Sequence, residues 1–186
     1  RVWVVKDGKA YPQKVNLGRD LGVETEIASG LNGDESIVTN HTVNVGDTAQ
    51  HAGVRWYEIR SPNATPKVFQ QGTYAPDGED RWMGSAAMDN AGDIALGYSL
   101  TSADRHPAIA YTARRASDAL GQMSLGEALM YQGVGSQTAT DSRWGDYSSM
   151  SVDPNGCTFW YTQEHYLGTG TFNWGTRIGA FTLPLC

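Results

Sequence analysis

The chain consists of short apolar stretches separated by clusters of glycine, aspartate and asparagine. Residues 23–28 show the pattern most clearly, because Val23, Thr25 and Ile27 alternate with glutamate or alanine. Alternation with a period of two is typical of a strand with one buried face. Applied to the whole chain, the pattern predicts strands over residues 2–5, 10–17, 23–28, 37–45, 53–60, 67–74, 82–88, 93–99, 108–114, 129–132, 148–152, 157–163 and 176–182.

The connections between these segments carry turn residues. Asp7-Gly8 predicts a two-residue type I′ hairpin, since glycine supplies the positive φ that this turn needs. Residues 82–88 and 93–99 are expected to form a hairpin, and residues 108–114 are expected to complete that unit. A second is expected from residues 129–132, 148–152, 157–163 and 176–182. A short helical turn is expected within residues 118–127.

Two stretches of the chain, residues 81–98 and 143–161, resemble each other. Each begins with an Arg-Trp pair and continues through a short strand, an Asp-x-x-Gly turn and an aromatic-rich strand. A β unit repeated in this way is typical of radial or stacked β arrays. We therefore expect Trp82 and Trp144 to occupy equivalent core or bracing positions in two repeats.

The composition supports an all-β fold and argues against nucleic acid as a partner and against a transmembrane helix. The 186 residues include 22 glycines, only 18% are charged, and the formal net charge is -6. The basic residues are scattered, with Arg114-Arg115 the one adjacent pair, so no basic footprint for nucleic acid is expected. No apolar run reaches the roughly 18 residues of a transmembrane helix. Because the sequence starts inside a strand-like run, it is interpreted as a fragment or a processed product.

The first part of the chain resembles one known family. The matching segments are Val2-Trp3-Val4-Val5-Lys6-Asp7-Gly8-Lys9-Ala10, Val15-Asn16-Leu17-Gly18, and residues 26–34. In order and spacing they are similar to the membrane-proximal, C-terminal part of the periplasmic adaptor (membrane fusion) subunits of bacterial efflux pumps. This resemblance covers residues 1 to about 39, and the adaptor's helical hairpin and lipoyl-like domain are missing from the sequence.

The rest of the chain, from about residue 36 to residue 186, resembles a different group. The matching segments include residues 52–60, residues 69–76, both Arg-Trp repeats and residues 174–181. They are similar to the C-terminal blades of large secreted bacterial β-propeller-like proteins, most of which have no assigned activity. The two resemblances overlap in residues 35–40. We interpret the chain as a fusion joined there; the alternative is one family whose first strands only look adaptor-like.

The expected fold is therefore all-β, with two parts. Residues 1–36 form a small adaptor-like β segment, and residues 37–186 form a partial β-propeller of about two to three blades. Closed propellers typically carry roughly four to eight blades, so this number cannot close a ring. We expect either a partner that completes the ring, such as the missing blades of a parent propeller, or an open, sandwich-like stack.

The two cysteines, Cys157 and Cys186, lie at the ends of two strands expected to be neighbours. We predict a disulfide between them, which would close a loop of about 30 residues and stabilise the fold by about 3–4 kcal/mol. The alternative is two free thiols. Because such bridges persist in oxidising compartments, the prediction favours an extracellular or periplasmic location.

Several polar motifs are candidate sites of chemistry. The turns that begin at Asp89 and Asp153 could hold a cation through their carboxylates, but the Asp-x-x-Gly pattern favours ordinary β-turns. The four histidines are scattered, so neither a zinc site nor any other cofactor is expected. Arg55, Arg81 and Arg143 each stand next to or near a tryptophan; they could clamp a carboxylate as in sialidases, or brace the blades by stacking on the ring.

The late aromatics are the remaining functional candidates. Trp144, Tyr147, Tyr166 and Trp174 occur around glycine- and threonine-rich loops, with Phe172 among them. Such rings could contact a sugar or a peptide, although packing in a β core is the alternative role.

The sequence leads to a non-enzymatic hypothesis: an extracytoplasmic binding or structural module of a bacterial secreted protein, with a protein or carbohydrate ligand. Two alternatives stay open. One is a periplasmic adaptor fragment of an efflux transporter, and the other is a fragment of a sialidase-like glycoside hydrolase.

Overall fold

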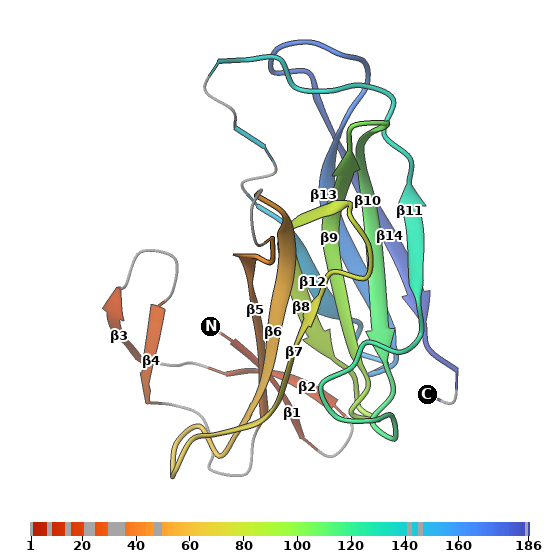
Figure 1. Ribbon diagram of the computed structural model, residues 1–186. Helices are drawn as coiled ribbons and strands as arrows, with labels where there is room; N and C mark the ends of the chain where they lie inside the picture. Colours follow the sequence, from red (N-terminus) through yellow and green to blue (C-terminus); the bar gives the residue numbers. More distant parts are fainter. Residues whose placement is uncertain are drawn as a thin grey trace.

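The computed structural model describes residues 2–6, 9–13, 16–20, 25–29, 36–46, 50–140, 143, 144, 147–184 and 186 (Figure 1). For the residues before Ser36 the description is of the backbone alone. Every regular element in these ranges is a β-strand, and all strand pairing between named strands is antiparallel. The all-β prediction is confirmed. Within the described ranges no helix is long and apolar enough to span a membrane.

The N-terminal strands form two separate hairpins. β1 (Val2–Lys6) pairs with β2 (Lys9–Gln13), and β3 (Asn16–Asp20) pairs with β4 (Thr25–Ser29). The single strand predicted over residues 10–17 is therefore wrong: it is two strands, which belong to different hairpins. The predicted turn residues Asp7 and Gly8 lie outside the described residues, but Lys6 opposes Lys9, as a two-residue hairpin requires.

The remaining strands form three meandering sheets, in which each strand pairs with the next along the chain. Sheet I contains β5 (Ser36–Asn44), β6 (Ala52–Arg60) and β7 (Lys67–Tyr74). Sheet II contains β8 (Asp80–Met88), β9 (Ile94–Ser102), β10 (Arg105–Arg114) and β11 (Glu127–Tyr131). Sheet III contains β12 (Ser149–Val152), β13 (Thr158–Tyr166) and β14 (Trp174–Thr182).

Two predictions in this region are wrong. β11 was expected to join the last sheet, but it pairs with β10 at the edge of sheet II. Its first residue, Glu127, is held there by an ion pair with the buried Arg81 of β8. The helical turn expected within residues 118–127 does not form, since Gly121 and Gly126 adopt positive φ and the segment contains only turns.

Sheet II is the middle layer of a three-sheet stack, and β9 is buried on both faces. Ile94, Leu96, Tyr98 and Leu100 belong to a core that includes Val54, Trp56 and Tyr74 of sheet I. Ala95 of the same strand belongs to a second core, with Met150, Phe159 and Tyr161 of sheet III. The two-residue period of β9 thus sends alternate side chains into two different cores.

The first strands of the three sheets lie side by side. β8 contacts both β5 and β12, as well as β6 (Figure 1). The two hairpin turns that follow β8 and β12 also touch, since the N–H of Asn90 donates to the carbonyl of Gly156 over 2.9 Å. Gly92 and Gly156 both adopt φ near +80°, at φ 82° and 80° respectively.

The Asp-x-x-Gly motifs are ordinary turns, as the pattern favoured. One carboxylate oxygen of Asp89 accepts hydrogen bonds from the N–H groups of Ala91 and Asp93, each over 2.9 Å. Asp153 accepts from the N–H of Asn155 and from the indole N–H of Trp160, over 2.9 and 3.0 Å. Among the described residues no group of three or more acidic, histidine or cysteine side chains could hold a metal.

A disulfide joins Cys157 to Cys186, with their Cα atoms 5.4 Å apart, which confirms the predicted bridge. Cys157 immediately precedes β13, and Cys186 follows β14, the strand that pairs with β13 along its whole length. The bridge therefore ties the end of the chain to the start of the middle strand of sheet III.

Candidate ligand-binding site

A pocket of about 450 Å³ opens at one end of sheet II. One wall is the β9–β10 hairpin, residues 101–107, and the opposite wall is formed by Ser136, Gln137 and Ala139. Trp82 of β8 and Trp144 complete the lining. The pocket thus combines two large aromatic side chains with several polar ones, and its volume lies within the range of small-molecule sites.

The wall after β11 is fixed by close backbone approaches. A Cβ atom on Gly133 would overlap the carbonyl oxygen of Pro107, and one on Gly135 would overlap the backbone of Gly168. Only glycine permits contact this close. Further on, the N–H of Thr138 donates to the carbonyl of Gly170 over 3.0 Å. The wall is therefore attached both to β10 and to the loop between β13 and β14.

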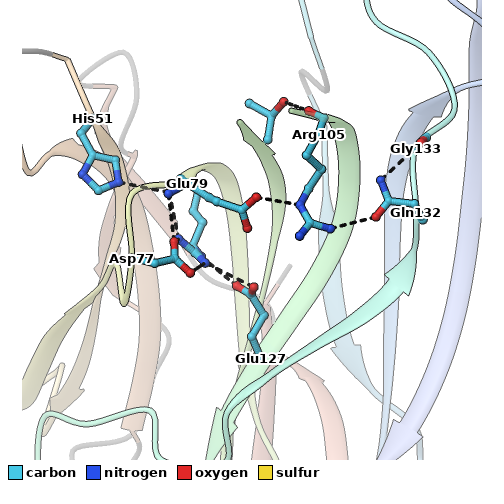
Figure 2. Close-up of polar contacts among 9 residues, drawn as sticks. His51, Asp77, Glu79, Arg105, Glu127, Gln132 and Gly133 are labelled. Atoms are coloured by element: carbon cyan, nitrogen blue, oxygen red, sulfur yellow. Dashed lines mark hydrogen bonds and ion pairs between the residues drawn. The ribbon is translucent and has the colours of Figure 1, made fainter. Parts of the chain in front are cut away.

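The hairpin wall is held by Arg105. Its Nε donates to Glu79 Oε1 over 2.7 Å and its Nη1 donates to Gln132 Oε1 over 2.9 Å (Figure 2). Glu79 precedes β8 and Gln132 follows β11, so Arg105 links the two edge strands of sheet II. Next to it, His106 Nδ1 lies 2.7 Å from the hydroxyl of Ser136, on the opposite wall. These contacts set the width of the pocket before any ligand arrives.

The two tryptophans differ in how much of each ring remains available. Trp144 is only 8% exposed. One of its faces stacks on Tyr166, with ring centroids 5.0 Å apart, and its indole N–H donates to Ser99 Oγ over 3.1 Å. Trp82 is half-buried and lies against Trp144 at a tilt of 60°. Trp82 therefore offers more free ring surface to the pocket.

A β-bulge next to Trp82 determines how the strand runs past the pocket. The register of β8 against β9 shifts between Trp82 and Ser85, and Met83 has a positive φ of 50°. Positive φ is uncommon for a residue with a Cβ and persists only where the surroundings hold it. Here the carbonyl of Met83 accepts hydrogen bonds from Ser148 Oγ and Gln163 Nε2 of the neighbouring sheet region.

Trp82 and Trp144 are not equivalent residues of two repeats, contrary to prediction. Trp82 lies within β8, whereas Trp144 lies in an irregular segment before β12. The two rings contact each other instead, with centroids 6.3 Å apart. The repeat is real at the level of the two hairpin turns, but it does not extend to the Arg-Trp pairs.

The candidate aromatics named from the sequence are placed as follows. Trp144 lines the pocket, Tyr166 is fully buried behind it, and Trp174 packs edge-on against Tyr166 with centroids 5.8 Å apart. Tyr147 is 84% exposed and is not part of the pocket lining. Sequence reasoning did not single out Trp82 or the hairpin side chains as candidate ligand contacts, although they line the pocket. The Arg81-Trp82 pair is the sequence signal for Trp82, and there the sequence favours a bracing role.

Arg81 and Arg55 contact tyrosine rings rather than their neighbouring tryptophans. Arg81 is fully buried, and its guanidinium binds Asp77 through two nitrogens, over 2.8 and 3.0 Å, and Glu127 over 2.7 and 3.2 Å. Burial acts to lower the pKa of Arg81, but the hydrogen bonds to Asp77 and Glu127 outweigh it and raise the pKa above its ordinary value. Tyr74 is the ring beneath this guanidinium, 5.6 Å away.

The other two arginines lie elsewhere. Arg55 projects from the side of β6 opposite Trp56 and donates to Thr73 Oγ1 over 3.0 Å, and Arg143 is exposed. Because Arg81 faces the interior between sheets I and II and is saturated by carboxylates, it cannot share a substrate carboxylate with Arg55. A clamp of the kind considered from the sequence is therefore not assembled from these two residues.

Comparison with protein-family models gives no match, and searches of curated proteins and of solved structures also give none.

Proposed function

We propose that this chain is a non-catalytic, extracytoplasmic binding module built from part of a β-propeller. The preformed pocket at the end of sheet II carries the proposal. It is lined by aromatic and polar side chains, and its walls are fixed by glycine contacts and hydrogen bonds that need no ligand. A binding site prepared in this way avoids the entropic cost of ordering loops when the ligand arrives.

The partial-propeller assignment is supported by the way the sheets stack. Each is an antiparallel meander, the stack is face to face, and the first strands β5, β8 and β12 are neighbours, as the inner strands of adjacent blades are. On this assignment residues 37–186 form about two to three blades. Residues 1–36, with their two isolated hairpins, remain the adaptor-like segment of a fusion.

The outward face of sheet III gives this proposal a place for further blades. Trp160 is 40% exposed and Ile178 is 62% exposed, and both point away from the core shared with sheet II. Ala180 lies opposite Trp160 and Thr162 lies opposite Ile178, so apart from Glu164 this part of the face presents small and apolar groups. We propose that the missing blades of a parent propeller would pack there.

Binding rather than catalysis is favoured by the acidic content of the pocket. Glycoside hydrolysis ordinarily uses a pair of carboxylates on either side of the bond that is cleaved. The described lining contains one acidic residue, Asp104, beside Arg105 and His106. The disulfide in turn favours an extracellular or periplasmic location, since such bridges persist in oxidising compartments.

A fluorescence screen tests this function. Trp82 and Trp144 report on the pocket, so the oxidised chain is titrated with saccharides, short peptides and nucleotides while tryptophan emission is recorded. A saturable change that Asp104→Ala weakens is the expected result. Turnover of fluorogenic sialosides or glucosides by the same preparation would overturn the non-catalytic assignment, and the lack of any saturable change would overturn the binding assignment.

A further inference from the structure

We infer that the pocket binds a neutral pyranose, with Trp82 as its stacking platform and Asp104 as an acceptor for two of its hydroxyls. The inference rests on the proposed binding function and names its ligand class. It starts from the surface that Trp82 leaves free. An indole ring offers a flat apolar face, which matches the C–H face of a pyranose ring.

Trp144 cannot serve as the platform in the same way. Its ring is covered on one side by Tyr166 and its N–H is used by Ser99. It acts as the back wall against which Trp82 is held. Trp82, the more exposed of the two rings, suits a ligand that stacks on one side and exposes polar groups on the other.

Some polar side chains of the pocket lining are already engaged in hydrogen bonds within the protein, and others are not. The amide of Gln137 is used at both ends, by the carbonyl of Arg143 and the N–H of Ala139. The hydroxyl of Thr101 donates to the carbonyl of Arg105. By contrast, the carboxylate of Asp104 is exposed and has no hydrogen bond or ion pair in the described structure.

A free carboxylate is suited to hydroxyl donors. It can accept from two neighbouring hydroxyl groups, one at each oxygen, and it offers no donor in return. The second ring nitrogen of His106 is available beside it, since only Nδ1 is engaged by Ser136. Vicinal hydroxyls on a sugar ring supply both donors and acceptors, so they can hydrogen-bond to a carboxylate and to a ring nitrogen.

The charge of the lining argues against an acidic ligand. Arg105 is paired with Glu79, which leaves the carboxylate of Asp104 as the unpaired charge among the described lining residues. An anionic sugar would be repelled by it at close range. A quaternary ammonium would be attracted, but such cations are normally held within a cage of several aromatic rings. The described lining has two tryptophans, of which Trp144 is 8% exposed.

The test uses the full oxidised chain and calorimetric titration. The probes are methyl glucopyranoside and a neutral glucose trisaccharide, with glucuronic acid, choline and triglycine as the competing chemistries. The variants are Trp82→Leu and Asp104→Asn. Their matched controls are Trp160→Leu and Glu164→Gln, which make the same Trp-to-Leu change and an equivalent carboxylate-to-amide change on the outward face of sheet III. Thermal unfolding of each variant checks that it is folded.

The expected result is saturable binding of the neutral saccharides, with affinity reduced by about tenfold or more in each pocket variant and unchanged in the controls. Tighter binding of glucuronic acid, choline or triglycine at the same pocket would overturn the neutral-sugar assignment and leave the binding function standing. Saccharide binding that Asp104→Asn does not weaken would also overturn the neutral-sugar assignment. Because Asp104 lies on an exposed turn, the Asp104→Asn variant remains informative if Trp82→Leu fails to fold. If the saccharides do not bind but another member of the fluorescence screen does, only the ligand class is wrong.

Discussion

The ring of Tyr161 in sheet III packs directly against Gly97 in sheet II: a Cβ atom on Gly97 would lie 2.5 Å from Cζ of the tyrosine. Both residues are buried, and the tyrosine hydroxyl is fixed by the side-chain amide of Gln163 over 3.1 Å. The separation of the two sheets at this point therefore depends on glycine. The φ of Gly97 is not positive, so space rather than backbone conformation is what requires it.

We predict that Gly97→Ala lowers the free energy of unfolding by about 1–3 kcal/mol, because the added methyl group overpacks the interface. Urea denaturation followed by tryptophan fluorescence measures the change. The control is Gly78→Ala, at a position where an added Cβ meets nothing within 4 Å. Equal stability of the two variants would mean that the sheets can separate at no cost, contrary to this account.

Sequence patterns located most of the strands because each strand has at least one buried face and each turn has its own residues. The prediction for residues 67–74 coincides with β7. The predicted boundaries are less accurate for a strand that is buried on both faces. The strand predicted over residues 93–99 is β9, which runs to Ser102. Because alternate side chains of β9 enter different cores, the polar–apolar alternation that would mark its extent is absent from the sequence. The sheet to which β11 belongs was predicted wrongly, because its position depends on the ion pair between Glu127 and Arg81.

The Cys157–Cys186 disulfide is predicted to stabilise the chain by about 3–4 kcal/mol, since it closes a loop of about 30 residues in the unfolded state. Intact mass with and without reductant should differ by the two protons of the thiols. The Cys157→Ser, Cys186→Ser double variant should lose this stability, measured by urea denaturation, and reductant should have no further effect on it. Alkylation of both cysteines in the oxidised, folded chain would contradict the prediction.

The buried Arg81 should be essential to the interface between sheets I and II. Arg81→Met leaves Glu127 beside Tyr98, whose hydroxyl donates to it over 2.8 Å, and removes the cation that is paired with Glu127 among the described residues. Removing one partner of a buried pair costs about 3–5 kcal/mol, and the lower end applies here because Glu127 and Asp77 are partly exposed. The second change, Glu127→Leu in the same chain, should recover part of the loss.

The measurement is again urea denaturation, with Arg55→Met as the control. Arg55 is a partly exposed arginine that makes one hydrogen bond to Thr73, and its loss should change stability by less than about 0.5–1 kcal/mol. If the two arginine variants were equally stable, the carboxylates around Arg81 would have to be fully solvated in the folded state.

The sequence could not reveal why arginine occurs at such buried positions. Arg81 and Arg114 are both fully buried between sheets I and II, yet a charged residue in a strand normally indicates the exposed face. The two arginines can be buried because each has polar partners: Asp77 and Glu127 bind Arg81, and the side chain of Gln70 binds Arg114. These partners come from other strands and loops, so only the folded chain brings them together. The same holds for the pocket, which joins Trp82 to Trp144.

His165 should make the fold sensitive to mild acid. It is 6% exposed and packs against Tyr131, with ring centroids 4.2 Å apart. Burial, and secondarily the positive charge of Arg177, lowers the pKa of His165 below its ordinary value of 6.5. The unfolded chain then binds the proton more readily than the folded chain, so stability should be lost as the pH falls from about 6.5 through the lowered pKa.

Unfolding free energies measured between pH 7.5 and pH 5 should therefore decline for the parent chain. His165→Gln should reduce the decline, and Arg177→Gln should reduce it in part, because burial remains after the charge is removed. A decline that His165→Gln leaves unchanged would assign the acid sensitivity to other groups.

The proposed division of the chain at residue 36 predicts that the N-terminal hairpins can be removed. β1 pairs with β2 and β3 with β4, and the pairing of sheets I to III is complete without them. Deletion of residues 1–33 should therefore leave the thermal unfolding transition of the remainder nearly unchanged. Deletion of residues 174–186 is the contrasting control: it removes β14 and the disulfide, uncovers β13, and should abolish the cooperative transition. If the N-terminal deletion lowered the transition as much as the C-terminal one, the hairpins would be part of the same cooperative unit, and the interpretation of the chain as a fusion of two separable parts would be wrong.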